Sequence, residues 1–431
     1  MFRVAVILFP GTNCEGETKR SLENAGLVAE YVRWNERQKL ETGNYDAFVL
    51  PGGFAYEDRS RAGIIAALDP VMEYIKQAAH QGKPVIGICN GCQVLVETGL
   101  IPGLDGDVLA GAVAMNTRVK GGQIIGTGFY HDTIYIKNVA TKGRSCVTTE
   151  LETDTIVPAT VANGEGRFIF PTDLLVELEK HNQILFKYCT QDGEVINEFP
   201  TTPNGAIWGI AGFCNPAGNV VAYMPHPERL ERNGESLFNH LRAWLENPPK
   251  HETYTIAWKP EPTVIESYQY QGNCIQLYVD LKITDNAAKT VELALRQKGF
   301  KVSVSRKTHW EIWYDESIKD MASVLPTLVD SGELMNTSKE KYTQLPSTNA
   351  KTMSFLVRFS DDFEGKAVTN TMRSRFGLTG IANINKGIVW ELTFESDDPA
   401  ERTKLATEIL NTHILFNPFS QDCALIVPAS K

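Results

Sequence analysis

The sequence lacks any apolar run that approaches the ~20 residues needed to cross a lipid bilayer. It also lacks an excess of positive charge, because 42 Lys and Arg residues stand against 52 Asp and Glu residues and give a net charge of −10. A protein that binds a phosphate backbone needs net positive charge. The apolar stretch at residues 4–9 is too short for a signal peptide and predicts a buried first strand. We therefore expect neither a membrane protein nor a nucleic-acid-binding protein.

Cysteine is sparse, with eight residues scattered over 431 positions. Without an export signal, scattered cysteines are most simply free thiols in a reducing cytosol, so we expect a cytoplasmic protein. The chain also lacks a Walker-type phosphate-binding loop, and we expect no cofactor and no metal site on it. Its apolar content of 42% and charged content of 22% are ordinary for a globular protein.

Residues 1–246 alternate short apolar runs with amphipathic stretches. The apolar runs at 4–9, 47–50, 84–88 and 220–224 each end abruptly in Gly, Pro or Asn. This pattern predicts an α/β domain built on a mostly parallel, doubly wound sheet. The chemistry of such domains lies beyond the carboxyl ends of the strands, so the residues that follow each run are the candidate site.

The rest of the chain has a different pattern. A polar linker at 247–268 precedes two α+β modules at 269–348 and 349–431, each expected to be of βαββαβ type. In the first module the stretches 302–304 and 310–314 predict a hairpin. The second module repeats the order about 80 residues later, with Trp390-Glu391 matching Trp310-Glu311. Each module predicts a sheet with one exposed apolar face, which we expect to pack on the other module or on a partner.

The strongest local signal is the segment Gly87-Ile88-Cys89-Asn90-Gly91. Small residues two positions before and after a nucleophile, between a strand and a helix, are typical of a nucleophile elbow. The following helix start would stabilise a thiolate and an oxyanion. Two other interpretations remain open: Cys89 and Cys92 form a Cys-x-x-Cys that suits a redox pair or half of a zinc site, and Cys89 could be a buried structural residue.

A thiol nucleophile needs a base, and His226 directly follows a predicted buried strand. Pro227 favours an extended conformation at His226, and residues two apart in an extended chain point the same way. Glu228 can therefore stand beside the imidazole as the third member of a triad. A rigid turn with a solvated histidine is the alternative. The paired glycines Gly52 and Gly53, after another strand, could present backbone N–H groups to an oxyanion.

Five short motifs in this region resemble those of a known family. They are Phe-Pro-Gly-Thr-Asn-Cys (9–14), Pro-Gly-Gly-Phe (51–54), Gly-Ile-Cys-Asn-Gly-Cys-Gln (87–93), Asn-Gly-Glu-Gly-Arg (163–167) and Met-Pro-His-Pro-Glu-Arg (224–229). With them the region resembles the class I, triad-type glutamine amidotransferases. More narrowly, it resembles the glutaminase subunit of phosphoribosylformylglycinamidine synthase.

The resemblance implies a reaction and a role for each residue. The Cys89 thiolate would attack the side-chain amide of glutamine, while His226, with Glu228 behind it, moves the protons. The backbone N–H groups of Gly53 and Asn90 would hold the oxyanion. The residues expected to contact glutamine or shape its pocket are Gln93, Gly52 and Phe54.

The second half resembles, less sharply, the small structural subunit of the same enzyme. The matching stretches are Asp-x-x-Gly-Lys (362–366) and Gly-x-x-Trp-Glu-Leu (387–392). The chain then resembles a glutaminase fused to a tandem copy of that subunit, and it would supply ammonia for de novo purine biosynthesis. The partner would be a separate, large synthetase subunit that binds ATP and magnesium and converts formylglycinamide ribonucleotide to its amidine.

Two other functions remain open at this point. A γ-glutamyl hydrolase or a related cysteine peptidase would use a similar elbow. A non-catalytic binding protein on the same fold would depend on neither Cys89 nor His226.

Overall fold

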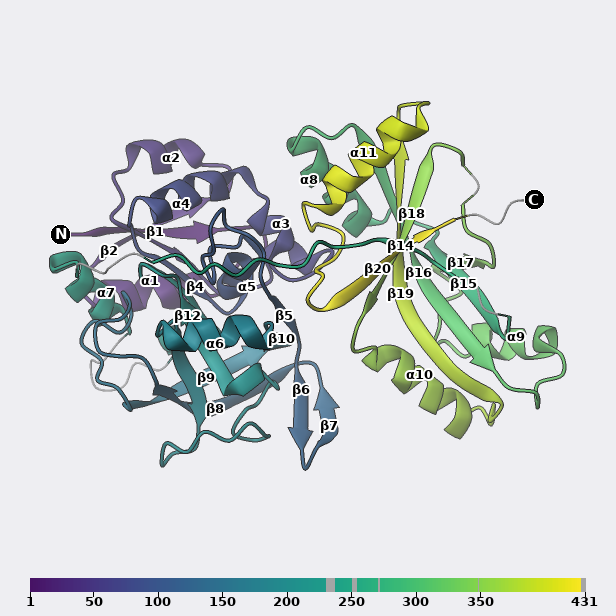
Figure 1. Ribbon diagram of the computed structural model, residues 1–431, viewed down its shortest axis with the longest axis horizontal. Helices are drawn as coiled ribbons and strands as arrows, with labels where there is room; N and C mark the ends of the chain where they lie inside the picture. Colours follow the sequence, from purple (N-terminus) through teal and green to yellow (C-terminus); the bar gives the residue numbers. More distant parts are fainter. Residues whose placement is uncertain (230–236, 250–253, 270–271, 348, 428–431) are drawn as a thin grey trace. The chain divides into compact units, whose positions relative to one another are not determined.

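The computed structural model describes residues 1–229, 237–249, 254–269, 272–347 and 349–427 (Figure 1). The chain divides into two units, Met1–Glu261 and Pro262–Lys431. The division falls inside the segment 247–268 that the sequence marks as a linker. Among the described residues, no helix combines the length and the apolar character required to span a membrane.

Unit 1 alternates strands and helices along most of its length. Its strands are β1 (Arg3–Leu8), β2 (Val28–Arg33), β3 (Ala47–Leu50), β4 (Val85–Ile88), β5 (Ala112–Met115), β6 (Thr117–Lys120), β7 (Gln123–Thr127), β8 (Tyr130–Asn138), β9 (Ile156–Asn163), β10 (Glu165–Ile169), β11 (Ile184–Cys189), β12 (Ile210–Cys214) and β13 (Val220–Tyr223). Its helices are α1 (Glu15–Asn24), α2 (Arg37–Thr42), α3 (Ile64–Ala67), α4 (Pro70–His80), α5 (Asn90–Glu97), α6 (Thr172–Lys180) and α7 (Leu237–Glu246).

The described part of unit 1 is built on a nine-stranded sheet of order β2-β1-β3-β4-β13-β12-β11-β8-β9. Strands β2, β1, β3, β4 and β13 are parallel, whereas the pairs from β13 through β9 are antiparallel. The predicted mostly parallel sheet therefore holds only for the first five strands. Strand β8 has exposed residues at one end and alternates buried with partly exposed ones at the other, and such one-sided strands are typical of antiparallel pairing.

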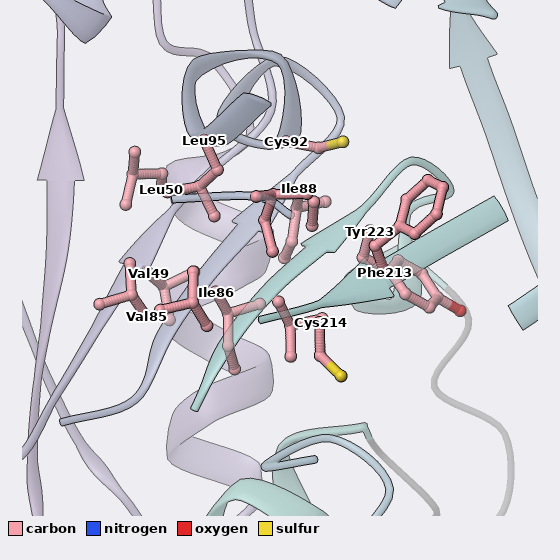
Figure 2. Packing of buried hydrophobic residues seen from close by; sticks show 14 of the residues in the cluster. Val49, Leu50, Val85, Ile86, Ile88, Cys92, Leu95, Phe213, Cys214 and Tyr223 are labelled. Atoms are coloured by element: carbon pink, nitrogen blue, oxygen red, sulfur yellow. The ribbon is translucent and has the colours of Figure 1, made fainter. Parts of the chain in front are cut away.

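The parallel half places four loops at one edge of the sheet. Strands β1, β3, β4 and β13 are direct neighbours, so the loops after them start from one edge. Their buried side chains form a dense apolar cluster, and Figure 2 shows Val49, Val85 and Ile86 in it together with Leu95 of α5. Because this core fixes the strand ends, the loops at that edge have little freedom.

Unit 2 contains one sheet and the remaining helices. Its strands are β14 (Glu266–Ser267), β15 (Cys274–Leu281), β16 (Val302–Tyr314), β17 (Glu340–Thr343), β18 (Thr352–Phe359), β19 (Ile381–Phe394) and β20 (Gln421–Ile426). Its helices are α8 (Asn286–Gln297), α9 (Met321–Asp330), α10 (Phe363–Ser374) and α11 (Pro399–Leu410).

The order strand, helix, strand, helix, strand occurs twice in unit 2. Asp285 caps α8 by accepting from Ala287 N–H at 2.9 Å, and Asp362 caps α10 by accepting from Gly365 N–H at 2.8 Å. The strands join in the order β14-β20-β18-β19-β16-β15-β17. The two halves thus meet edge to edge through β16 and β19, and not face to face, which was one of the two arrangements predicted; the other was packing on a partner.

The predicted hairpin at 302–314 is wrong, because β16 is one continuous strand of 13 residues. It pairs with β19 from Val302 opposite Phe394 to Tyr314 opposite Ile381. The polar residues 305–309 interrupt the apolar alternation without supplying Gly, Pro, Asn or Asp, the residues that a tight turn favours. Each half is therefore βαβαβ with a long central strand, and not βαββαβ.

The repeated Trp-Glu pair joins the two halves. The Glu311 carboxylate of β16 accepts from Arg358 Nη2 at 2.8 Å and from Asn385 Nδ2 at 3.1 Å, both in the second half. In the reverse direction, Glu391 of β19 accepts from Ser305 Oγ and lies 2.9 Å from Lys307 Nζ. Equivalent glutamates thus bind groups of the opposite half.

The Glu311 carboxylate is held in its charged form. Burial alone would raise its pKa, but Arg358 and Tyr268 outweigh burial and lower the pKa to about 2. A carboxylate whose pKa is lowered by folding stabilises the fold at pH values above about 4.3, its pKa in the unfolded chain. This stabilisation is lost as the pH falls towards the pKa of the folded state.

We expect Glu311→Gln to lower the free energy of unfolding of unit 2 by about 3 kcal/mol at pH 7, because it leaves Arg358 without its buried counter-charge. The difference from wild type should shrink between pH 4 and pH 2. Urea unfolding of the full chain, followed by tryptophan fluorescence, measures both effects. Asp397→Asn is the matched control, since Asp397 pairs with Lys351 while its side chain is 88% exposed; a comparable loss in the control would contradict the prediction.

Candidate active site

Cys89 lies on the tight bend between β4 and α5. Its φ and ψ are 50° and −104°, a backbone conformation that costs a non-glycine residue about 1–3 kcal/mol. A Cβ on Gly87 would overlap the carbonyl oxygen of Gly91, and one on Gly91 would overlap the carbonyl oxygen of Leu50. The glycines that flank Cys89 are therefore required by close backbone contacts, as a nucleophile elbow demands.

His226 and Glu228 form a buried pair after β13. The His226 N–H donates to the Thr160 carbonyl oxygen at 2.7 Å, which fixes the backbone. Glu228 Oε1 lies 2.6 Å from His226 Nδ1, and the two side chains are 0% and 2% exposed. The carboxylate therefore orients the imidazole ring and leaves Nε2 as the nitrogen available for chemistry.

The His226 imidazole is near Cys89. A methyl group on Gly52 would lie 2.7 Å from His226 Cε1, 3.1 Å from Cys14 Sγ and 3.4 Å from Cys89 Cβ, so these three side chains converge on one glycine. Burial alone would lower the pKa of His226, but Cys89, Cys14 and Glu228 outweigh burial and raise it. These surroundings therefore favour the protonated form of His226.

The Gly52–Gly53 turn packs closely on the loop after β1. Gly53 has φ 152°, and a Cβ there would lie 2.7 Å from Thr12 Cα. The Gly52 carbonyl oxygen accepts from Cys14 N–H at 3.1 Å. On the other side, the Asn90 side chain accepts from Ala55 N–H at 2.8 Å. The turn is thus held between the first loop and the start of α5.

These loops surround a pocket of about 360 Å³, a size that suits a small ligand. Of the predicted site residues, Cys89, Gly53, Phe54, Gln93 and His226 line it. The remaining lining residues are Asn13, Cys14, Asp58, Phe129, Ala162, Asn163, Gly164, Glu165 and Arg229. Glu228 lies behind His226, and neither it nor the predicted site residues Gly52 and Asn90 line the pocket.

Both polar atoms of the Gln93 side chain form hydrogen bonds within the protein. Its Nε2 donates to the Glu165 carbonyl oxygen at 2.6 Å, and its Oε1 accepts from Asn90 Nδ2 at 2.8 Å. The side chain therefore ties α5 to β10. This arrangement shapes the pocket wall, whereas Phe54, half exposed, forms part of the rim.

Four charged or thiol-bearing residues of the pocket had no role assigned from the sequence: Cys14, Asp58, Glu165 and Arg229. Burial raises the pKa of Asp58 to about 6, and burial together with the nearby Asp58 raises the pKa of Glu165 to about 7. Cys14 and Asp58 follow parallel strands, so strand-end position could have pointed to them. Glu165 opens β10, outside the main sheet, and no strand-end rule points to it.

Asn163 adds an amide to the pocket wall. Its Oδ1 accepts from Asn116 Nδ2 at 2.9 Å. Its own Nδ2 is buried and has no hydrogen-bond partner within the residues that the structure describes. The side chain therefore offers a donor at the pocket.

Cys92 belongs to the core and not to the pocket. Its side chain is fully buried in the apolar cluster of Figure 2, and burial raises its pKa. All eight cysteines are free thiols, so Cys89 and Cys92 are not joined in a disulfide. The geometry disfavours the interpretation of this Cys-x-x-Cys as a redox pair.

Comparisons with known proteins identify the family of this unit. Residues 1–256 match the family of CobB/CobQ-like glutamine amidotransferase domains. Subunit PurQ of phosphoribosylformylglycinamidine synthase from Methanothrix thermoacetophila is 44% identical over 228 residues, which are 53% of this chain and 86% of that protein. The PurQ subunit from Methanopyrus kandleri is 37% identical over 250 residues, which are 57% of this chain and 99% of that protein.

Among solved structures, a chain of PurLQS from Thermotoga maritima is 28% identical, with a TM-score of 0.45, over 57% of this chain and 99% of its own length. Each of these three proteins therefore matches only 53% to 57% of the chain. From the sequence matches, the chain belongs to the CobB/CobQ-like glutamine amidotransferase family, with its N-terminal unit in the group of PurQ glutaminase subunits of phosphoribosylformylglycinamidine synthase.

Proposed function

We propose that the chain hydrolyses glutamine with a Cys89–His226–Glu228 triad and passes the ammonia to a separate ATP-dependent synthetase. Its family membership makes it the glutaminase component of phosphoribosylformylglycinamidine synthase, an enzyme of purine biosynthesis. Two features support this mechanism. Cys89 lies on a strained elbow with a φ of 50°, and the Nδ1 atom of the nearby His226 lies 2.6 Å from Glu228.

In the first half-reaction, the Cys89 thiolate attacks the side-chain carbonyl carbon of glutamine. The backbone N–H groups of Gly53 and Asn90 hold the oxyanion of the tetrahedral intermediate, because a first-turn N–H of a helix has no intrahelical acceptor. The His226 imidazolium then gives its proton to the departing nitrogen. Ammonia leaves, and a γ-glutamyl thioester remains on Cys89.

In the second half-reaction, neutral His226 takes a proton from water, and the resulting hydroxide attacks the thioester carbonyl. The tetrahedral intermediate collapses to glutamate and the Cys89 thiolate, with His226 protonated again. Glu228 stabilises the imidazolium in both steps without exchanging a proton itself.

The charges of the pocket suit a free amino acid. Asp58 and Glu165 are carboxyl groups and Arg229 is a guanidinium group, and all three line the pocket that contains Cys89. The ammonium group of a zwitterionic substrate can pair with the carboxyl groups, and its carboxylate can pair with the guanidinium group. Asn163 and the rim residue Phe54 complete the walls. We assign the α-ammonium of glutamine to Asp58, which is fixed by an Asn90 Nδ2 donor at 3.1 Å.

We assign to unit 2 the role of docking the synthetase. In this role it would be the tandem counterpart of the small structural subunit. Its support is the repeated βαβαβ order and the exchange of glutamate contacts across β16 and β19. ATP, magnesium and formylglycinamide ribonucleotide would bind the synthetase, and the complex would work in the cytoplasm. Transfer within a complex keeps the ammonia from protonation in bulk water.

A γ-glutamyl hydrolase or cysteine peptidase is the weaker alternative, because it leaves unit 2 without a role. A non-catalytic binding protein does not explain why strain is stored at Cys89 beside a buried His226–Glu228 pair.

The triad is tested with a glutamine analogue that carries a diazoketone. We expect the wild-type chain to be labelled at Cys89 and His226→Ala to be labelled at least about 100-fold more slowly. Glu228→Gln should lower kcat for glutamine by a similar factor, since the imidazolium loses its counter-charge. Peptide mapping by mass spectrometry locates the adduct. Cys92→Ala is the matched control and should be labelled at the same rate as wild type. An adduct found mainly on Cys92 would contradict the proposed triad.

Asp58 is tested through the pH dependence of KM. Because a carboxyl group is charged above its pKa, we expect KM for glutamine to rise as the pH falls from about 7 to below 6, as Glu165 and Asp58 become protonated. Asp58→Asn should raise KM at pH 7.5 by about ten-fold or more with a smaller effect on kcat, and should weaken its pH dependence. Glu57→Gln is the control from the same loop, with a side chain 76% exposed; an equal rise in KM there would refute the assignment.

Docking is tested by mixing the full chain with a synthetase subunit of the PurL type. We expect the free chain to hydrolyse glutamine slowly, and the rate to increase about ten-fold or more with synthetase, ATP and formylglycinamide ribonucleotide present. Cys89→Ser should still bind the synthetase and allow amidination from added ammonium, but not from glutamine. Equal rates with and without the synthetase would contradict activation by docking.

A further inference from the structure

Asn163 holds a hydrogen-bond donor that has no acceptor in the part of the chain that the structure describes. Its Nδ2 is buried and unpaired there, and the residue as a whole is 5% exposed. Asn163 ends β9 and lines the pocket that contains Cys89. Buried polar groups almost always have a hydrogen-bond partner, and an unsatisfied one lowers stability. A donor left open at a pocket therefore points to an acceptor on the ligand.

The orientation of this amide is fixed by its neighbours. Asn116 Oδ1 accepts from Gly166 N–H at 2.7 Å. The other end of the same side chain, Asn116 Nδ2, donates to Asn163 Oδ1 at 2.9 Å and to the Asn163 carbonyl oxygen at 2.8 Å. Because a backbone N–H can only donate, this chain of hydrogen bonds distinguishes oxygen from nitrogen at both asparagines. Nδ2 is therefore the atom of Asn163 that is left for a ligand.

The end of β9 lies close to the nucleophile. The Ala162 carbonyl oxygen is 4.0 Å from Cys89 Sγ, and Asn163 is the next residue along the chain. In an extended glutamine, the reacting carbon and the α-carboxyl carbon are about 5 Å apart. A glutamine whose amide is at Cys89 is therefore long enough for its α-carboxylate to reach Asn163 Nδ2.

The α-carboxylate is also the one acceptor of glutamine that the proposed mechanism leaves for Asn163. The amide oxygen of the substrate is held by the backbone N–H groups of Gly53 and Asn90, while its amide nitrogen and α-ammonium are themselves donors. Arg229 can pair with the carboxylate, but its Nη2 also donates to Cys14 Sγ at 3.2 Å. A carboxylate accepts from several donors at once, so it can bind Asn163 as well as Arg229.

We propose that Asn163 Nδ2 donates to the α-carboxylate of glutamine and thereby makes the chain selective for an amide substrate with a free carboxylate at this position. This inference rests on the proposed function, since it assigns a role within the same site. Asn163 binds substrate and moves no proton, so its contribution belongs to binding and not to the chemical step. A glutamine residue within a peptide has no such carboxylate and is expected to be a poor substrate.

The test compares the labelling of Cys89 in the full chain by two diazoketones, the glutamine analogue and the same compound without its α-carboxylate. We expect Asn163→Ala to lower the second-order rate constant of labelling by the glutamine analogue about ten-fold or more, because a hydrogen bond to a charged group is lost. Labelling by the carboxylate-free compound should stay within two-fold of wild type, which also shows that the variant folds around Cys89. Equal loss with both compounds, or loss with neither, would overturn the proposal.

Turnover of glutamine supplies the second measurement. Asn163→Ala should raise KM about ten-fold or more with a smaller effect on kcat, and Asn163→Asp should raise KM further, because its carboxylate repels that of the substrate. Gln123→Ala, which removes an exposed amide at the start of β7, is the matched control and should behave like wild type. An active wild type that Asn163→Ala equals in both assays refutes this inference alone. A wild type that neither hydrolyses glutamine nor is labelled refutes the proposed function, and this inference with it.

Discussion

Close backbone contact at the Cys89 elbow is the constraint on which the site depends. Gly87 and Gly91 allow β4 and α5 to approach so closely that any side chain at either position would overlap a carbonyl oxygen. The bend holds Cys89 at a positive φ, and the packing of the surrounding apolar core offsets the strain energy. Without that packing, Cys89 would relax from its strained conformation, and its position relative to His226 would no longer be fixed.

The active-site environment combines strong burial with a high density of charge. Burial opposes the charged forms of His226, Asp58 and Glu165, yet it also strengthens each interaction among them. The buried His226–Glu228 contact has a cost to stability, because neither group is solvated.

The sequence predicted the strands that carry the site more reliably than the arrangement of unit 2. Runs 47–50 and 220–224 were recognisable because buried parallel strands are continuously apolar. The hairpin predicted at 302–314 was wrong because the polar middle of β16 pairs with β19, some 80 residues away, and no local pattern records such a partner. Glu165 was left without a role for a similar reason, since only tertiary folding places β10 at the pocket.

Residue types and short spacings were enough to indicate which residue can be a nucleophile, which histidine can stand beside a carboxylate, and where glycine is needed. These are properties of residue type and short spacing, and they are local. Folding of distant segments was needed to show that Glu165 joins Cys89 in one pocket while Cys92 is enclosed in the core. The physical reason is that convergence depends on the order and direction of strands in a sheet, which distant segments settle together when they bury their apolar surfaces.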